Sequence, residues 1–121
     1  MSAQKTKNQN STRYYSNLQE TKIVKLLGGQ QTPNSGATDF IKGDVRIKEA
    51  SMICECKTCV NEKESFSIKK EWLDKNEQEA RITHFSNSML AFNFGPDSKN
   101  YFIINEKLAK YLVDKIKEDL N

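Results

Sequence analysis

The chain has 121 residues, a length that supports one domain with a modest hydrophobic core. Its 19 Lys and Arg against 16 Asp and Glu give a net charge of +3, which neither requires nor opposes a polyanionic partner. No apolar run approaches the ~18 residues that a membrane span needs, and the polar N-terminus lacks the apolar segment of a secretory signal. We therefore expect no membrane partner and a cytoplasmic protein.

The first twelve residues contain no Val, Ile, Leu or aromatic side chain, which predicts a disordered polar tail over residues 1–12. A single domain is expected over residues 13–121. It begins with a helix from Arg13 to Leu27, which Gly28 and Gly29 end because glycine accepts the left-handed conformation. A loop rich in turn residues follows over Gln30–Ala37.

Four further segments have the residue types and alternation of strands, and two have helical periodicity. The first two strands are expected to form a hairpin. The predicted order is α-β-β-α-β-β-α, an α/β (α+β) fold whose central mixed sheet of about four strands is flanked by helices. The predicted strands are Phe40–Ile47, Ala50–Lys57, Met89–Phe94 and Tyr101–Asn105, and the predicted helices are Ser65–Ala80 and Glu106–Leu120.

Three cysteines lie close together at Cys54, Cys56 and Cys59. Their odd number and the missing signal argue against a disulfide framework and for free thiols. Cys54 and Cys56 alternate on a predicted strand, where they suit a structural, buried role. A zinc site with His84 is the alternative, although the usual spaced pairs of ligands are absent.

Charged residues interrupt the first two predicted strands. Asp44 lies within the first strand, and Glu55 and Lys57 share one face of the second because side chains alternate along a strand. If these strands pair, two carboxylates and an ammonium group converge at one edge of the sheet. Such carboxylates suit Mg²⁺, and a nearby lysine can stabilise charge on a phosphate, so the set favours phosphodiester hydrolysis. The alternative is an ordinary cross-strand salt bridge of Glu55 with a neighbouring cation.

Further residues follow in a fixed order around this set. They are Glu20, SGA at Ser35–Ala37, GD at Gly43 and Asp44, ECK at Glu55–Lys57, and SFSIKKEW at Ser65–Trp72. Together they resemble the PD-(D/E)XK nuclease superfamily. Within it the chain is most similar to the small Holliday junction resolvase-like nucleases of archaea and phages, over Leu18–Ala80. The resemblance implies a restriction-endonuclease-like core. One position departs from the superfamily pattern, because Gly43 replaces the nominal proline before the aspartate, as is common in the resolvase branch.

The resemblance also implies a metal site and a catalytic lysine. By position, Asp44 and Glu55 match the metal-binding acids, and Glu20 matches the helical glutamate that completes the site. The backbone carbonyl of Cys56 matches a further metal ligand, so the cysteine side chain need not take part. Lys57 matches the catalytic lysine. The implied cofactor is Mg²⁺, with Mn²⁺ as a substitute.

DNA contacts are implied at two places. Ser35 matches a serine in the loop that lies close to DNA and the active site in the resolvases, and Gly36 belongs to the same loop. Ser67, Lys69 and Lys70 match the start of the helix after the motif, where DNA contacts are also expected.

The first functional prediction is a metal-dependent DNA endonuclease that cuts four-way junctions in recombination and repair. The resemblance implies that its products are a 5′-phosphate and a 3′-hydroxyl. A homodimer is expected because a junction presents two symmetric strands to two sites. Two alternatives remain open: a restriction or repair endonuclease that acts on duplex or flapped DNA, and a non-catalytic nucleic-acid-binding protein with a nuclease-like fold.

The only tryptophan, Trp72, is spaced from Ile68 like two residues on one helix face. This spacing favours a core anchor over a platform for stacking on a nucleic-acid base. The final helix alternates lysines with acidic residues and is therefore expected to present a solvated face rather than a basic patch.

Overall fold

The computed structural model describes residues 2–32 and 43–121, with side chains from Thr12 onward in these ranges. The helices in this part of the chain are α1 (Ser2–Leu27), α2 (Lys70–Ile82), α3 (Glu106–Leu120) and the short 3₁₀ helix η1 (Lys48–Ala50). The strands there are β1 (Gln30–Gln31), β2 (Gly43–Ile47), β3 (Met52–Cys56), β4 (Asn87–Phe92) and β5 (Tyr101–Ile103).

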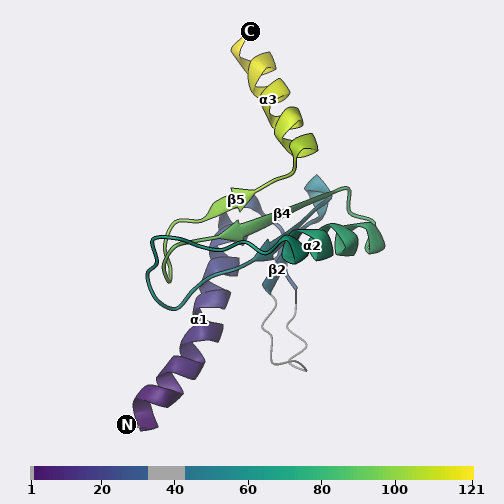
Figure 1. Ribbon diagram of the computed structural model, residues 1–121. Coiled ribbons are helices and arrows are strands. Elements are labelled where there is room, and N and C mark those ends of the chain that lie inside the picture. Colours follow the sequence, from purple (N-terminus) through teal and green to yellow (C-terminus); the bar gives the residue numbers. More distant parts are fainter. Residues whose placement is uncertain (1, 33–42) are drawn as a thin grey trace.

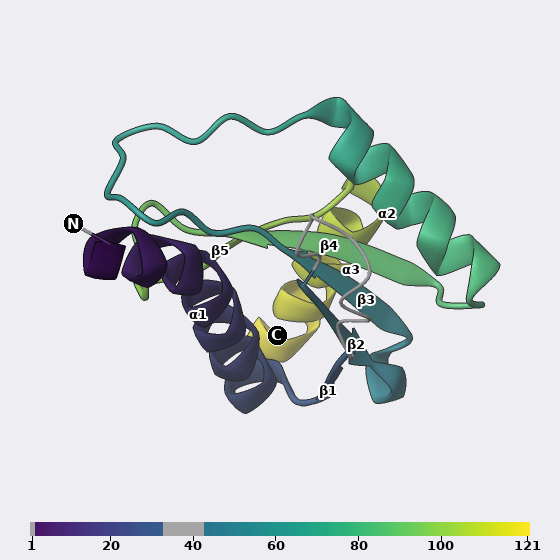
Figure 2. The ribbon, with the colours of Figure 1, turned by 90° about the horizontal axis from the view of Figure 1, so that it is seen from below.

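The strands form one mixed sheet in the order β1-β2-β3-β4-β5, in which only β3 and β4 run parallel. Helices α1 and α2 lie on opposite sides of this sheet (Figures 1 and 2). The fold is therefore α+β, as predicted, with an open five-stranded sheet rather than one of about four strands. The additional strand, β1, consists of two exposed glutamines and carries no apolar pattern that would predict it.

The core on the α1 side is built from alternate residues of β2 and β3. Val45 pairs with Cys54, and both are fully buried against Ile23 of α1. Cys54 and Cys56 are thus free, buried thiols, as predicted. The opposite face of the sheet packs against α2, where Ile53 and Leu90 are fully buried. Each face of the central strands is therefore covered by one helix.

Helix α1 ends where the sequence predicts but begins earlier. Gly28 has a φ of 83°, and its N–H donates to the carbonyl of Val24 at 2.8 Å, which closes the last turn. The helix starts at Ser2, so the segment 2–12 expected as a disordered tail continues it. No glycine or proline interrupts this segment, so nothing in it breaks the helix.

The predicted hairpin of β2 and β3 is confirmed. Helix η1 makes the turn, and Ser51 completes it in the left-handed region with a φ of 49°. The predicted residues 40–42 of the first strand lie outside the described residues. The second strand is shorter than predicted, since it runs over Met52–Cys56.

Other boundaries shift for identifiable reasons. Helix α2 begins at Lys70 rather than Ser65, because Lys69 has an extended backbone and Phe66 in the irregular segment before it packs against Phe92, with ring centroids 5.4 Å apart. Strand β4 begins earlier, at Asn87, whose N–H donates to the carbonyl of Ser51 at 2.8 Å. Strand β5 is shorter than predicted and ends at Ile103.

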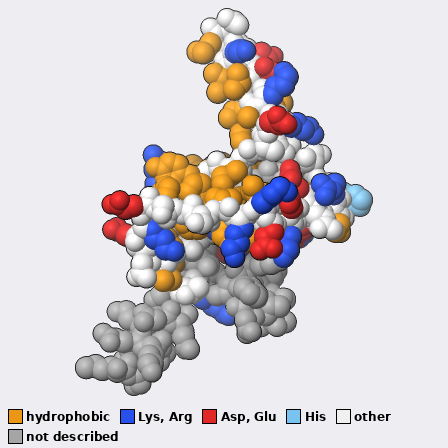
Figure 3. Space-filling model, viewed as in Figure 1, with side chains coloured by type: hydrophobic (Ala, Val, Ile, Leu, Met, Phe, Trp, Pro, Cys, Tyr) orange, Lys and Arg blue, Asp and Glu red, His pale blue; other side chains and the backbone are white. Residues whose placement is uncertain are grey.

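Helix α3 has the predicted bounds and begins at an N-cap, where the Asn105 side chain accepts from the N–H of Leu108 at 2.9 Å. It projects away from the sheet (Figure 1), and none of its residues is buried. Its apolar side chains lie at the surface, as the space-filling view shows (Figure 3). Five of them are between 48% and 81% exposed: Tyr111, Leu112, Val113, Ile116 and Leu120.

Within the described residues, no helix combines the length and apolar character needed to cross a membrane.

Candidate active site

Asp44 and Glu55 lie directly opposite each other on adjacent antiparallel strands. Because their neighbours Val45 and Cys54 face α1, the two carboxylates face the α2 side of the sheet. Each residue is only 6% exposed. Residues opposed in this way have Cβ atoms about 5 Å apart, a separation that one cation between two carboxylates can bridge. The sequence prediction that Asp44 lies beside Glu55 is therefore confirmed at the level of strand register.

Glu20 approaches this pair from the other side of the sheet. It belongs to α1, which packs against β2, and it is 4% exposed. Burial and, as the smaller cause, the neighbouring charge of Asp44 together raise the pKa of Glu20 from 4.5 to about 7. Glu20 and Asp44 are therefore close enough for their charges to interact across the layers.

The side chain of Cys56 points into the core on the α1 side, away from the face that carries the Glu55 carboxylate. Its thiol lies 3.8 Å from the carbonyl of Cys54. The hydrogen bond with Cys54, burial, and then the charges of Cys54, Glu20 and Asp44 all raise the pKa of this thiol. Cys56 therefore stays a neutral core residue, and only its backbone is available to a metal site.

Lys57 follows directly after β3, and its backbone is held from two sides. Its N–H donates to the carbonyl of Ala91 at 2.8 Å, and its own carbonyl accepts from the Gln19 side-chain amide at 2.7 Å. Its ammonium nitrogen lies 4.4 Å from the centroid of the Trp72 ring, within the range of a cation–π contact. Trp72 is half-buried, so its ring both packs and carries a cation.

The structure describes only some of the residues for which the resemblance implies DNA contacts. Ser35 and Gly36 lie outside the described residues. Ser67 and Lys69 are exposed in the segment before α2, and Lys70 is the first residue of that helix. Lys70 forms an ion pair with Asp74, its i+4 neighbour, at 2.8 Å, and the hydrogen bond in this pair raises the pKa of Lys70. The Lys69 ammonium lies 5.9 Å from the centroid of the Trp72 ring, so the start of α2 adjoins Lys57.

Sequence reasoning missed Gln19, which is 2% exposed beside Glu20. Besides the carbonyl of Lys57, its amide donates to the side-chain oxygen of Asn100 at 3.1 Å. Asn100 in turn accepts from the buried Asn93, whose oxygen accepts from the Thr58 hydroxyl at 2.9 Å. The i, i+4 spacing from Gln19 to Ile23 on one helix face was the available signal that Gln19 is buried.

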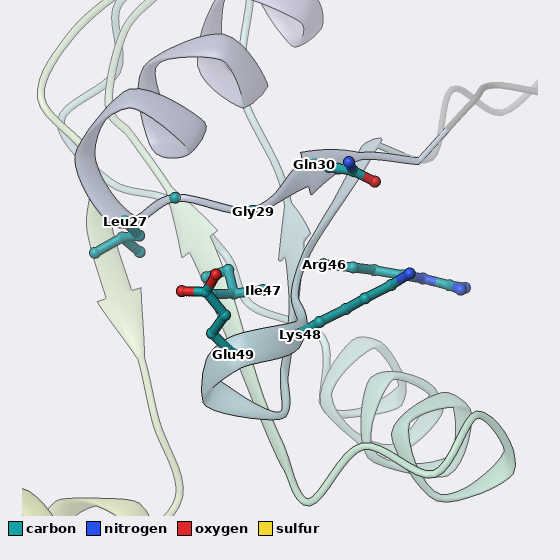
Figure 4. Close-up of a pocket in the computed structure, with 8 residues that line it drawn as sticks. Leu27, Gly29, Gln30, Arg46, Ile47, Lys48 and Glu49 are labelled. Carbon is teal, nitrogen blue, oxygen red and sulfur yellow. The ribbon is translucent and has the colours of Figure 1, made fainter.

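A pocket of about 340 Å³ lies at the other end of the hairpin, between the end of α1 and the turn into η1. Figure 4 shows Arg46 and Lys48 extending to one side of it and Glu49 turning to the other. Asp44, Glu55 and Lys57 do not line this pocket. It is therefore separate from the candidate active site.

The carboxylates of Asp44 and Glu55 provide some of the oxygen ligands that a hard divalent cation prefers. Two carboxylates in register match the one or two that Mg²⁺ commonly takes, with water filling its other positions. Among residues 2–32 and 43–121, no three His, Cys, Asp or Glu side chains gather closely enough to hold an ion by themselves. The structure thus pairs Asp44 with Glu55 and brings Glu20 near, without assembling all three into one ligand cluster.

A scan against protein-family models gave no match to this chain, and searches of curated proteins and of solved structures gave none either. The functional argument therefore depends on the chain's own residues and geometry.

Proposed function

We propose that this protein is a metal-dependent DNA endonuclease of the PD-(D/E)XK type, with a nuclease-like core, that cuts branched DNA such as a Holliday junction. The observation that carries the proposal is the register of Asp44 opposite Glu55, both buried on the α2 side of the sheet. Lys57 directly follows the strand that carries Glu55, so a cation site and an ammonium group would adjoin. This is the chemistry that phosphodiester hydrolysis requires.

Asp44 and Glu55 would hold Mg²⁺, or Mn²⁺ in its place, with Glu20 and the backbone carbonyl of Cys56 as further ligands. The bound ion would make a coordinated water more acidic and offset negative charge on the scissile phosphate. The fit is supported by the hard oxygen donors of Asp44 and Glu55 and by the nearness of Glu20 to Asp44. A divalent cation would also offset the repulsion between the carboxylates.

In the proposed reaction a water oxygen forms a bond to phosphorus, and the bond between phosphorus and the 3′ oxygen breaks. The electron pair of the broken bond stays on the 3′ oxygen, which takes up a proton and leaves as a 3′-hydroxyl. The proton lost by the water passes to solvent, and the other product is a 5′-phosphate. Lys57 contributes by placing its positive charge where the phosphate gains negative charge.

DNA would run along the start of α2, where Ser67, Lys69 and Lys70 are exposed. Ser35 and Gly36 are proposed as a second contact. A homodimer would present two such sites to the two symmetric strands of a junction. The exposed apolar side chains of α3 offer the surface through which two copies would associate.

The test compares the wild-type chain with Asp44→Ala and Lys57→Ala, and with Lys75→Ala as an exposed control on α2. We expect Mg²⁺-dependent cleavage of a synthetic four-way junction by the wild type and the control. Each site variant should lose at least about 10²-fold in kcat, as expected for removal of one transition-state contact. Unchanged cleavage by either variant would contradict the assignment.

The same measurement decides between the alternatives when flapped and linear duplex substrates are included at one salt concentration, since phosphate binding falls steeply with salt. Preferential cleavage of linear or flapped DNA would replace the junction by a restriction or repair substrate. A non-catalytic role would follow if no substrate is cut and calorimetry with Mg²⁺ or Mn²⁺ gives no heat that depends on Asp44.

A further inference from the structure

We propose that Trp72 is a positioning residue that holds the ammonium group of Lys57 in its working place over the indole ring. This inference rests on the proposed function, because it assigns Lys57 a role in phosphodiester cleavage. Its basis is the contact itself, in which the Lys57 nitrogen lies 4.4 Å from the ring centroid. Tryptophan is the aromatic side chain that binds a cation most strongly in this way.

The backbone of Lys57 is already fixed, which leaves its long side chain as the variable part. Hydrogen bonds with Ala91 and Gln19 hold its N–H and carbonyl at the end of β3. A lysine side chain loses up to ~2 kcal/mol of rotamer entropy when it is ordered. A favourable contact with one ring face offsets part of this cost before substrate arrives. The ammonium group would then need little reorganisation during the reaction.

The ring itself stands on a well-anchored element. Trp72 lies in the first turn of α2, where its backbone N–H donates to the carbonyl of Lys69 at 3.0 Å. One turn further, the buried Asn76 amide donates to the carbonyl of Met89 in β4 at 2.9 Å. Near the other end of α2, Glu79 forms an ion pair with Arg46 of β2 at 3.4 Å. The indole is therefore held relative to the same sheet that carries Asp44 and Glu55.

A second lysine shares the ring. The Lys69 ammonium lies 5.9 Å from the same centroid, and Lys69 is exposed where Lys57 is half-buried. Any change of Trp72 thus affects two cations, one proposed for chemistry and one proposed for DNA contact. A Lys69→Gln variant separates them, because it leaves Lys57 on the ring.

The contact can be tested without any activity, because Trp72 is the only tryptophan in the chain. In NMR spectra the Lys57 Cε methylene protons should be shifted upfield by the ring current of Trp72. This shift should be smaller in Trp72→Phe, which keeps a smaller ring, and absent in Trp72→Leu, which has none. Indole emission should change in Lys57→Met but not in Lys75→Met. Unshifted Lys57 protons in the wild type, with identical emission in both variants, would overturn the proposal.

The catalytic consequence is tested by replacing Trp72 with indoles of increasing fluorination, which weaken the negative ring face while keeping nearly the same shape. We expect kcat on the junction to fall stepwise, by roughly 5- to 30-fold over the series, with KM within about 2-fold, as the loss of a desolvated cation–π contact implies. Trp72→Phe should retain more activity than Trp72→Leu. Lys69→Gln should instead raise KM and leave the fluorination series intact.

The outcomes separate the two proposals. A constant kcat across the fluorinated proteins, with the wild type active and Asp44→Ala inactive, would overturn the positioning role and leave the nuclease proposal standing. A wild-type protein that cuts no DNA would overturn the nuclease proposal and with it the catalytic role of the contact. Because the fluorinated side chains preserve packing, a folding defect in Trp72→Leu does not affect this decision.

Discussion

The side-chain amide of Gln19 donates a hydrogen bond to the backbone carbonyl of Lys57 across 2.7 Å, which joins α1 to the end of β3. Each partner is close to a proposed metal ligand along the chain. Gln19 directly precedes Glu20, and Lys57 follows the strand that contains Glu55. The bond therefore fixes the two layers of the candidate site relative to each other. It also satisfies a backbone carbonyl that water reaches poorly.

Gln19→Ala should destabilise the protein by about 2–3 kcal/mol, because it removes a buried donor from the carbonyl of Lys57 and from Asn100. Gln31→Ala is the matched control. Gln31 also donates from its amide to α1, but in an exposed position, so the change should stay within about 0.5 kcal/mol. Urea unfolding of both variants measures the difference, and equal losses would show that Gln19 is not a structural link.

The pKa of Glu20 predicts how stability depends on pH. In the folded chain this carboxyl holds its proton up to about pH 7, whereas in the unfolded chain it releases the proton near pH 4.5. Stability from this group is therefore fully present below pH 4.5 and is lost as the pH rises to about 7, with a total on the order of 3 kcal/mol. Free energies of unfolding measured across this range in metal-free buffer check the slope.

Glu20→Gln should remove this part of the pH dependence and leave the protein more stable than the wild type at neutral pH. The exposed Glu49→Gln should leave the slope unchanged. If the wild type and Glu20→Gln have parallel stability profiles, Glu20 is ionised in the folded chain and lies in a more polar place than the structure gives it.

Gly28 and Gly29 allow a clean separation of backbone strain from steric overlap. Both have positive φ, at 83° and 94°. A Cβ at Gly28 would meet nothing within 4 Å, whereas one at Gly29 would lie 2.5 Å from the carbonyl oxygen of Arg46. Gly28→Ala should therefore cost about 1 kcal/mol, and Gly29→Ala about 3 kcal/mol or more. Thermal and urea unfolding would contradict this placement of the chain if the two costs were the same.

The exposed apolar side chains of α3 predict where the proposed homodimer forms. Leu112→Glu and Ile116→Glu should each weaken self-association by about 100-fold, because a charge would be buried in an apolar contact. Lys117→Glu, on the same helix, changes charge without adding it to an apolar position and should have little effect. Sedimentation equilibrium measures all three variants. A wild type that stays monomeric at every concentration would remove the homodimer from the proposal.

Local chemistry made much of this fold predictable. The end of α1 at Gly28, the bounds of α3, the β2–β3 hairpin and the burial of Cys54 and Cys56 all follow from glycine conformation or from side-chain periodicity. Polar segments carried no such signal. The two-residue β1, the early start of β4 at Asn87 and the helical backbone before Arg13 were therefore missed.

The amino-acid sequence by itself determined which side chains are available and which of them share a face, because alternation along a strand is a local property. It placed Glu55 with Lys57 and indicated Asp44 as a second acid, whereas Glu20 was predicted only from the family resemblance. Only the tertiary structure decided that Asp44 lies opposite Glu55, that Glu20 is near Asp44 from the other layer, and that the Lys57 ammonium group lies over the Trp72 ring. These relationships depend on the length of the turn at η1 and on how two helices pack on one sheet, and such long-range geometry has no signature in neighbouring residues.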